Sequence, residues 1–165
     1  MMKVRFAAAI LTVACILSSC LGETERTVTE TEDASVTQED LTDNGPMDTD
    51  KLQLMIDGSQ VPVTWEKNDS TEALMALCET GSLVIRMTMY GGFEQVGSIG
   101  QSLPSDDEQI TTQSGDIVLY SDDQIVLFYG SNTWDYTRLG RMELSAPELS
   151  ELLGNEDVVI ELFVQ

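Results

Sequence analysis

The residues best suited to chemistry in this chain are aromatic side chains and arginines that gather in one stretch of the sequence. They are Arg86, Tyr90, Phe93, Phe128, Tyr129, Trp134, Tyr136 and Arg138. In such a set, aromatic rings can bury an apolar side chain while a guanidinium donates hydrogen bonds to a backbone carbonyl. These residues therefore predict a shallow groove that binds a peptide or a small molecule without any covalent step.

Two interpretations of the aromatic residues are open at this stage. Side chains along a strand point alternately inward and outward, so some of the rings belong to a hydrophobic core. We expect Phe128 to be a core residue. The aromatic residues in or near glycine-rich turns, for which a binding role and a core role both fit, are Tyr90, Phe93, Trp134 and Tyr136.

The chain contains no histidine, and this excludes several kinds of active site. Neither a Ser-His-Asp nor a Cys-His catalytic unit can be built, and histidine-ligated zinc is excluded as well. The stretch 92–98 has part of the spacing of a phosphate-binding loop, but it lacks the lysine that this loop requires. The sequence therefore predicts no metal site, no cofactor and no bound nucleotide.

The charge of the chain limits its partners. It carries 29 acidic and 8 basic residues, which gives a formal net charge of −21. Such a chain repels the phosphates of nucleic acids and the headgroups of anionic lipids. We therefore expect no nucleic-acid partner, whereas basic partners are compatible with this charge.

The N-terminal segment has the pattern of an export signal. Lys3 and Arg5 precede an apolar run, residues 6–17, that is shorter than the run a transmembrane helix needs. The run ends in Leu-Ser-Ser-Cys20, which resembles a bacterial lipobox. We expect residues 1–19 to be a lipoprotein signal peptide and Cys20 to carry the lipid that anchors an exported chain to a bacterial membrane, inner or outer. An ordinary cleaved signal with a chance cysteine is the alternative.

The remaining chain divides into a linker and a domain. Residues 20–50 are rich in Thr, Glu and Asp and have few apolar side chains, so we expect a lipidated cysteine followed by a disordered acidic linker. The folded domain is predicted to span residues 51–165. Its one cysteine, Cys78, lies on the apolar face of a predicted helix, which favours a buried thiol over a nucleophile. No intramolecular disulfide is expected.

Short apolar runs separated by turn residues predict a mainly β domain. Capping residues predict two short helices, one from Asp69 to Gly81 and one from Ser145 to Gly154. About seven strands with two helices favour a closed or nearly closed antiparallel barrel, and an open sandwich is the main alternative. The strands are expected at residues 52–56, 61–65, 83–90, 109–112, 116–120, 124–129 and 158–164.

Several motifs in this domain resemble the bacterial cyclophilin-like domain family, and the resemblance covers residues 51–165. The motifs are Tyr90-Gly-Gly-Phe-Glu-Gln-Val-Gly97, Gln101-Ser-Leu-Pro104, Gly115-Asp-Ile-Val-Leu-Tyr120, and Phe128-Tyr-Gly-Ser-Asn-Thr-Trp134 through Arg138-Leu-Gly-Arg141. The resemblance implies a closed antiparallel β-barrel of about eight strands with two short flanking helices. This fold is similar to that of the cyclophilins, which are peptidyl-prolyl isomerases.

The same resemblance implies roles for two residues. Arg86 is similar in place to the cyclophilin arginine that polarises the proline amide, and Trp134 to the tryptophan that lines the proline pocket. The full cyclophilin signature, Phe-Met-x-Gln-Gly-Gly-Asp-Phe, is not present. We therefore expect a non-enzymatic module that binds a peptide or small ligand through Tyr90, Phe93, Tyr129, Trp134, Tyr136 and Arg138.

Two alternatives to this function are kept. One is a prolyl isomerase that acts on exported proteins, with Arg86 as its catalytic residue, because isomerisation needs neither a nucleophile nor a histidine. The other is an accessory lipoprotein whose acidic surface binds a partner, in which case the binding weakens as salt is added. The sequence leaves the oligomeric state open.

Overall fold

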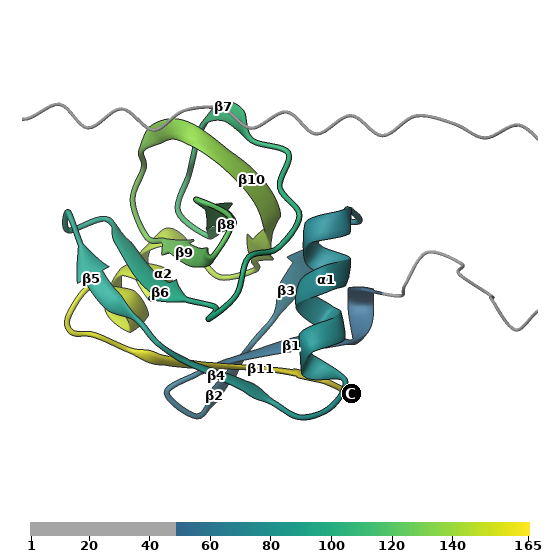
Figure 1. The fold of residues 1–165 in the computed structure, drawn as a ribbon. Helices are drawn as coiled ribbons and strands as arrows, with labels where there is room; N and C mark the ends of the chain where they lie inside the picture. The colour runs from purple at the N-terminus through teal and green to yellow at the C-terminus, as the bar shows by residue number, and fades with distance from the viewer. Residues whose placement is uncertain (1–48) are drawn as a thin grey trace, which may run out of the picture. The chain divides into compact units, whose positions relative to one another are not determined.

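The computed structural model describes residues 49–165, which form eleven strands, two α-helices and one short 3-10 helix, Thr49–Lys51 (Figure 1). The predicted signal peptide, Cys20 and nearly all of the predicted linker lie outside the described residues. Neither helix within residues 49–165 has the length and apolar character needed to cross a membrane.

A four-stranded antiparallel sheet forms one side of the domain. Its strands, in hydrogen-bonded order, are β2 (Ser59–Val61), β1 (Leu52–Ile56), β11 (Val159–Val164) and β4 (Leu83–Arg86). Buried and partly exposed residues alternate along β1, where Leu52, Leu54 and Ile56 point into the core. The sheet therefore covers the core with one face only.

A second antiparallel sheet has seven strands. In order, six of them are β3 (Val63–Trp65), β10 (Thr133–Met142), β8 (Asp116–Tyr120), β9 (Gln124–Phe128), β6 (Glu94–Ser98) and β5 (Thr88–Tyr90), while β7 (Glu108–Thr111) pairs with β10. The central strands β8 and β9 are buried on both faces, since the runs 117–119 and 125–128 contain only buried residues. These continuous apolar runs mean that both faces of the two central strands are covered by other side chains of the domain.

The two sheets are joined at two corners of a single residue each. Pro62 separates β2 from β3, and Met87 separates β4 from β5. Pro62 has no backbone N–H, and Met87 donates its N–H to the carbonyl of Val158 (2.8 Å). Gly97 leaves room for the second corner, because a methyl group there would lie 2.5 Å from Met87 Sδ and 2.6 Å from Ile85 Cγ2. Both edge strands of the small sheet thus continue into edge strands of the large one.

This topology confirms part of the predicted architecture and changes the rest. The domain is mainly β with two helices and antiparallel sheets, as expected. The closed barrel of about eight strands is not confirmed, because the ladders stop at the two corners and neither sheet closes on itself. The predicted strands 61–65 and 83–90 are each divided at a corner residue. The sequence patterns also missed β6 and β10.

Two α-helices accompany the sheets, α1 (Asp69–Cys78) beside β3 and β10, and α2 (Ala146–Leu153) near β9 and β6 (Figure 1). The start of α2 is confirmed, because Glu148 accepts hydrogen bonds from the backbone N–H (2.8 Å) and the hydroxyl (2.6 Å) of Ser145. These bonds lower the pKa of Glu148. The predicted end at Gly154 is confirmed as well.

The N-cap of α1 lies one residue before the predicted cap. Asn68, not Asp69, is the N-cap, and its Oδ1 accepts a hydrogen bond from the backbone N–H of Thr71 (2.9 Å). The same side chain donates from Nδ2 to the carbonyl of Arg138 (2.8 Å), and so ties the helix to β10. Either residue of an Asn-Asp pair can cap a helix, so the local sequence does not distinguish between them. The hydrogen bond to β10 favours Asn68.

The main hydrophobic core lies between the two sheets and includes Cys78 on α1. Burial raises the pKa of this thiol to about 11, and the expected buried cysteine is confirmed. A smaller cluster of Val118, Val126, Phe128 and Tyr136 packs on the other face of β8 and β9. Phe128 is fully buried in it, as expected. The large sheet therefore has a core face and a second, partly covered face.

The cap of α1 gives a test of the fold. Asn68→Ala should lower the free energy of unfolding by about 1–2 kcal/mol, because it removes both the cap and the link to β10. Asp69→Ala is the matched control and should cost less, since that exposed side chain is not the cap. Urea denaturation of both variants measures the difference. A larger loss for Asp69→Ala would contradict the assigned cap.

Candidate functional site

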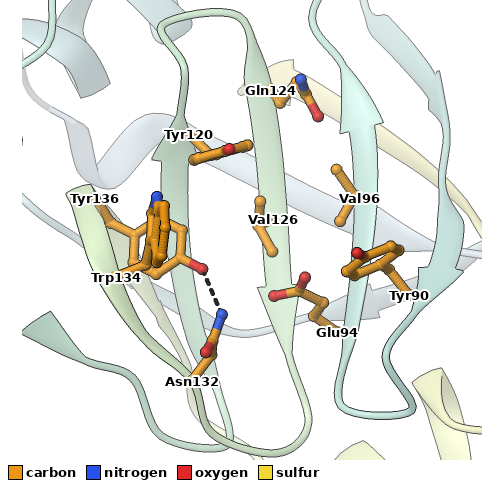
Figure 2. Close-up of a pocket in the computed structure, with 9 residues that line it drawn as sticks. All are labelled: Tyr90, Glu94, Val96, Tyr120, Gln124, Val126, Asn132, Trp134 and Tyr136. Atoms are coloured by element: carbon orange, nitrogen blue, oxygen red, sulfur yellow. Dashed lines mark hydrogen bonds between the residues drawn. The ribbon is translucent and has the colours of Figure 1, made fainter.

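The second face of the large sheet contains a pocket with a volume of about 280 Å³ (Figure 2). It spans strands β5, β6, β8, β9 and β10, with one further residue from the loop before β10. Aromatic, aliphatic, amide and carboxylate side chains all contribute to its lining. The nine lining residues are Tyr90, Glu94, Val96, Tyr120, Gln124, Val126, Asn132, Trp134 and Tyr136.

The alternation of side chains along the strands places these residues on one face. On β6, Glu94 and Val96 line the pocket, while Gln95 between them points to α2 and donates from Nε2 to the carbonyls of Leu153 and Glu156 (both 2.7 Å). On β10, Trp134 and Tyr136 are two residues apart and therefore share a face. The pocket is thus fixed by strand geometry rather than by a loop.

Four aromatic rings pack against one another in series at the pocket, and two of them, Tyr120 and Tyr136, also line it. Phe93 stacks on Phe128, with ring centroids 6.4 Å apart and an angle of 6° between the planes. Phe128 meets Tyr136 edge-on at 5.7 Å, and Tyr136 meets Tyr120 edge-on at 5.9 Å. Asn132 donates from Nδ2 to the Tyr136 hydroxyl (3.0 Å), which orients that ring. Such contacts hold the pocket walls in one arrangement.

Two large aromatic side chains at the pocket are exposed to solvent. Tyr90 is 67% exposed and Trp134 is 56% exposed, and only Val84 joins them among the exposed large hydrophobic residues of the described chain. In Figure 2 their rings stand on opposite sides of Glu94. Exposed aromatic rings that gather at one pocket indicate a surface on which a ligand can pack.

Glu94 is the one charged residue in the lining, and it is only 6% exposed. Burial raises its pKa. Its Oε2 is buried and has no hydrogen-bond partner within residues 49–165, and both ion pairs of this region involve Asp116 instead. The pKa of Tyr136 is raised as well, mainly by the burial of its own hydroxyl and secondly by the negative charge of Glu94. The carboxylate is therefore free to accept a hydrogen bond from a ligand, or to hold a proton.

A family model described as the cyclophilin-like family matches residues 54–162. The chain belongs to the cyclophilin-like family. The family prediction is confirmed, and searches among curated proteins and among solved structures found no match. The matched span includes every residue that lines the pocket, so the pocket is part of the cyclophilin-like domain itself.

The structure brings together three of the predicted ligand-binding residues of this cyclophilin-like domain. Tyr90, Trp134 and Tyr136 all line the pocket. Phe93 is not in the lining but packs under it against Phe128. Tyr129 packs against the main core instead. Its pKa is raised, mainly by burial and secondly by the negative charge of Glu94. The difference arises because Tyr129 directly follows β9, one residue out of phase with the pocket face.

The two predicted arginines lie outside the pocket. Arg86 ends β4 in the small sheet and is exposed, because the chain changes sheets at Met87. Arg138 pairs with Asp116 (3.2 Å) and lines a separate, more polar cavity of about 420 Å³ that shares Tyr136. Asp116 also holds Arg141 (2.7 Å). Neither guanidinium is therefore placed to act on a ligand in the aromatic pocket.

Sequence reasoning missed Glu94 and Tyr120 as site residues. Glu94 stands in a glycine-rich stretch that does not read as a strand, so its direction could not be inferred. Tyr120 follows the buried run 117–119, and such a run predicts a strand with both faces covered. The buried run could have indicated the site, because a strand that is covered on both faces requires further side chains packed on its second face. Within residues 49–165, no three Cys, Asp or Glu side chains gather closely enough to hold a metal.

The buried carboxyl gives a test by pH. Burial raises the pKa of Glu94 above its ordinary value of 4.5, so the folded state binds this proton more tightly than the unfolded chain does. Its contribution to stability is present below about pH 4.5 and is lost as the pH rises through the raised pKa. The stability of Glu94→Gln relative to the wild type should therefore increase between about pH 4 and about pH 7.5, as measured by urea denaturation.

Glu148→Gln is the control with the opposite sign. Hydrogen bonds from Ser145 lower the pKa of Glu148, so its stabilising contribution is present above the ordinary pKa and is lost in acid. The stability of the wild type relative to this variant should therefore increase as the pH rises. Parallel pH profiles for the two variants would contradict the burial of a titrating group at Glu94.

Proposed function

We propose that this cyclophilin-like domain is a binding module that holds a small ligand or the side chain of a peptide in the aromatic pocket, without catalysing a reaction. The observation that carries this proposal is the pair of exposed rings, Tyr90 and Trp134, at the pocket of a rigid sheet. Exposed aromatic surface is unfavourable in water, and a ligand that packs between the rings removes it.

The alternative of prolyl isomerisation has less support. It requires a donor that stabilises the twisted amide in the pocket where the proline binds. Arg86, the residue predicted for this task, is on the small sheet and does not line the pocket. The lining contains no arginine or lysine, so the donors that it does offer, such as the amides of Gln124 and Asn132, are uncharged. The geometry of the described residues therefore favours binding over isomerisation.

The proposal also places the module at a bacterial membrane. The basic and apolar segment before Cys20 and the small residues next to it support export as a lipoprotein. The acidic stretch that follows has too few apolar residues to form a core, and it supports a tether between lipid and domain. A ligand would then be bound outside the cytoplasm.

Binding can be tested with a panel of small amines, amides, alcohols and carboxylic acids. Saturation-transfer NMR on the full-length protein should detect fragments that bind. Trp134→Ala and Tyr90→Ala should each lower the affinity for these fragments by about tenfold, because truncation of an aromatic anchor costs about 1 kcal/mol or more of binding free energy. Arg86→Ala is the matched control on the small sheet and should leave binding unchanged.

Exchange NMR on an Ala-Pro peptide separates the two functions. The full-length protein, present at catalytic amounts, should leave the rate of cis–trans exchange unchanged. Acceleration that disappears in Arg86→Ala would contradict the proposal and establish an isomerase. Fragment binding that survives both aromatic truncations would instead place the ligand elsewhere on the domain.

Membrane attachment has its own test. In bacteria that express the full chain with labelled palmitate, the wild type should incorporate label and fractionate with membranes. Cys20→Ala should lose both properties, because this residue is the proposed lipid acceptor. Cys78→Ala is the control and should keep both, since its thiol is buried in the core. Label retained by Cys20→Ala would show that the lipobox interpretation is wrong.

A further inference from the structure

We propose that the pocket recognises an organic ammonium group, on a free amine or on a lysine side chain, which pairs with Glu94 between aromatic walls. This assignment rests on the proposed binding function and names the ligand chemistry for the same pocket. Three properties of the described residues lead to it: a buried carboxylate without a partner, aromatic rings on two sides of it, and a lining without positive charge.

The carboxylate of Glu94 points into the pocket from β6 (Figure 2). The residue is 94% buried, as 6% remains exposed, and within residues 49–165 nothing donates a hydrogen bond to its Oε2. A buried charge without a partner is unfavourable, and a buried neutral acid without a partner is unfavourable to a smaller degree. A ligand ammonium supplies both an opposite charge and N–H donors, so it satisfies this oxygen directly.

Four of the nine lining residues are aromatic, and three of them lie on the two sides of this carboxylate. Figure 2 shows Tyr90 on one side of Glu94 and Trp134 and Tyr136 on the other. The face of an aromatic ring carries partial negative charge and attracts cations, most strongly for tryptophan. The rings and the carboxylate therefore favour the same kind of ligand, a cation on an organic stem.

The charges of the domain exclude the opposite chemistry. No lysine or arginine lines the pocket, and both arginines of β10 are paired with Asp116. The chain as a whole has a net charge of −21, which draws cations to its surface and repels anions. Ligands that present a carboxylate or a phosphate would therefore meet an unpaired negative charge, with no positively charged side chain in the lining to balance it.

The size of the pocket suits one short side chain. Its volume of about 280 Å³ lies just below the range of about 300–1,000 Å³ that is usual for drug-sized ligands. Aliphatic surface from Val96 and Val126 lies close to the carboxylate and can contact the carbon stem. An alkyl chain that ends in an ammonium group meets both requirements.

Fluorescence titration of the full-length protein provides the test. The chain has two tryptophans, and Trp134 is the exposed one at the pocket, whereas Trp65 is buried with its N–H donated to the Leu52 carbonyl. At about pH 7.5, butylammonium should bind about tenfold or more tightly than butyramide, which has a similar size and no charge. This comparison needs no variant and so does not depend on any variant folding.

Variants then locate the interaction. Glu94→Gln should lower the affinity for butylammonium by about tenfold or more and remove its advantage over butyramide. Asp135→Asn is the matched control, since it removes one exposed carboxylate from the same strand as Trp134 but outside the lining. Its affinity for butylammonium should stay within about twofold of the wild type. Urea denaturation of each variant checks that it is folded.

The outcomes separate this inference from the proposed function. Equal binding of butylammonium and butyramide, with both affected by Tyr90→Ala, would keep the binding module and overturn the ammonium assignment. Equal losses in Glu94→Gln and Asp135→Asn would also overturn it, because the effect would then be that of net charge alone. No response to either probe, together with no fragment binding, would overturn both.

A second pair of probes distinguishes the source of the ammonium group. A peptide with blocked ends and one lysine should bind, and the same peptide with that lysine acetylated should not. Tighter binding of the lysine peptide than of butylammonium would assign a polypeptide ligand. Tighter binding of butylammonium would assign a free amine, and either result supports the carboxylate as the determinant.

Discussion

The buried side chain of Gln95 fixes the strand on which the candidate site depends. Its amide is fully buried and donates to two carbonyls at and just beyond the C-terminal end of α2, those of Leu153 and Glu156. Carbonyls at the end of a helix lack partners within the helix, so these bonds satisfy groups that would otherwise be unpaired. Because side chains alternate along a strand, the direction of Gln95 also sets that of Glu94. A slip by one residue would point the carboxylate at α2.

The large sheet combines two different surfaces on its opposite faces. The core face packs against the small sheet and both helices, as in an ordinary domain interior. The other face begins as a core of Phe128 and Val118 and then opens into a pocket with a buried carboxylate. An unpaired buried acid breaks the usual rule for polar groups, and natural proteins tend to break such rules at functional sites. The stability of the core face offsets this local cost.

Local patterns predicted the elements whose sequence carries its own signal. The strands at 52–56 and 116–120 and the helix start at Ser145 were found because alternation, apolar runs and capping residues are all local. The long strand β10 was missed, since its residues 133–138 are mostly polar or aromatic and its register shifts between Arg138 and Gly140. The placement of Arg86 could not be predicted either. It depends on a change of sheet at Met87 that only long-range pairing reveals.

The burial of Cys78 has a consequence for where this chain can fold. With a pKa of about 11, roughly one thiol in ten thousand is ionised at neutral pH, and only the thiolate reacts with oxidants and disulfides. The sequence has no other cysteine after Cys20, so the domain has no internal crosslink to form or lose. Its covalent structure is therefore the same in a reducing cytosol and in an oxidising compartment. Maturation needs no thiol oxidase or disulfide isomerase, whichever side of a membrane the domain folds on.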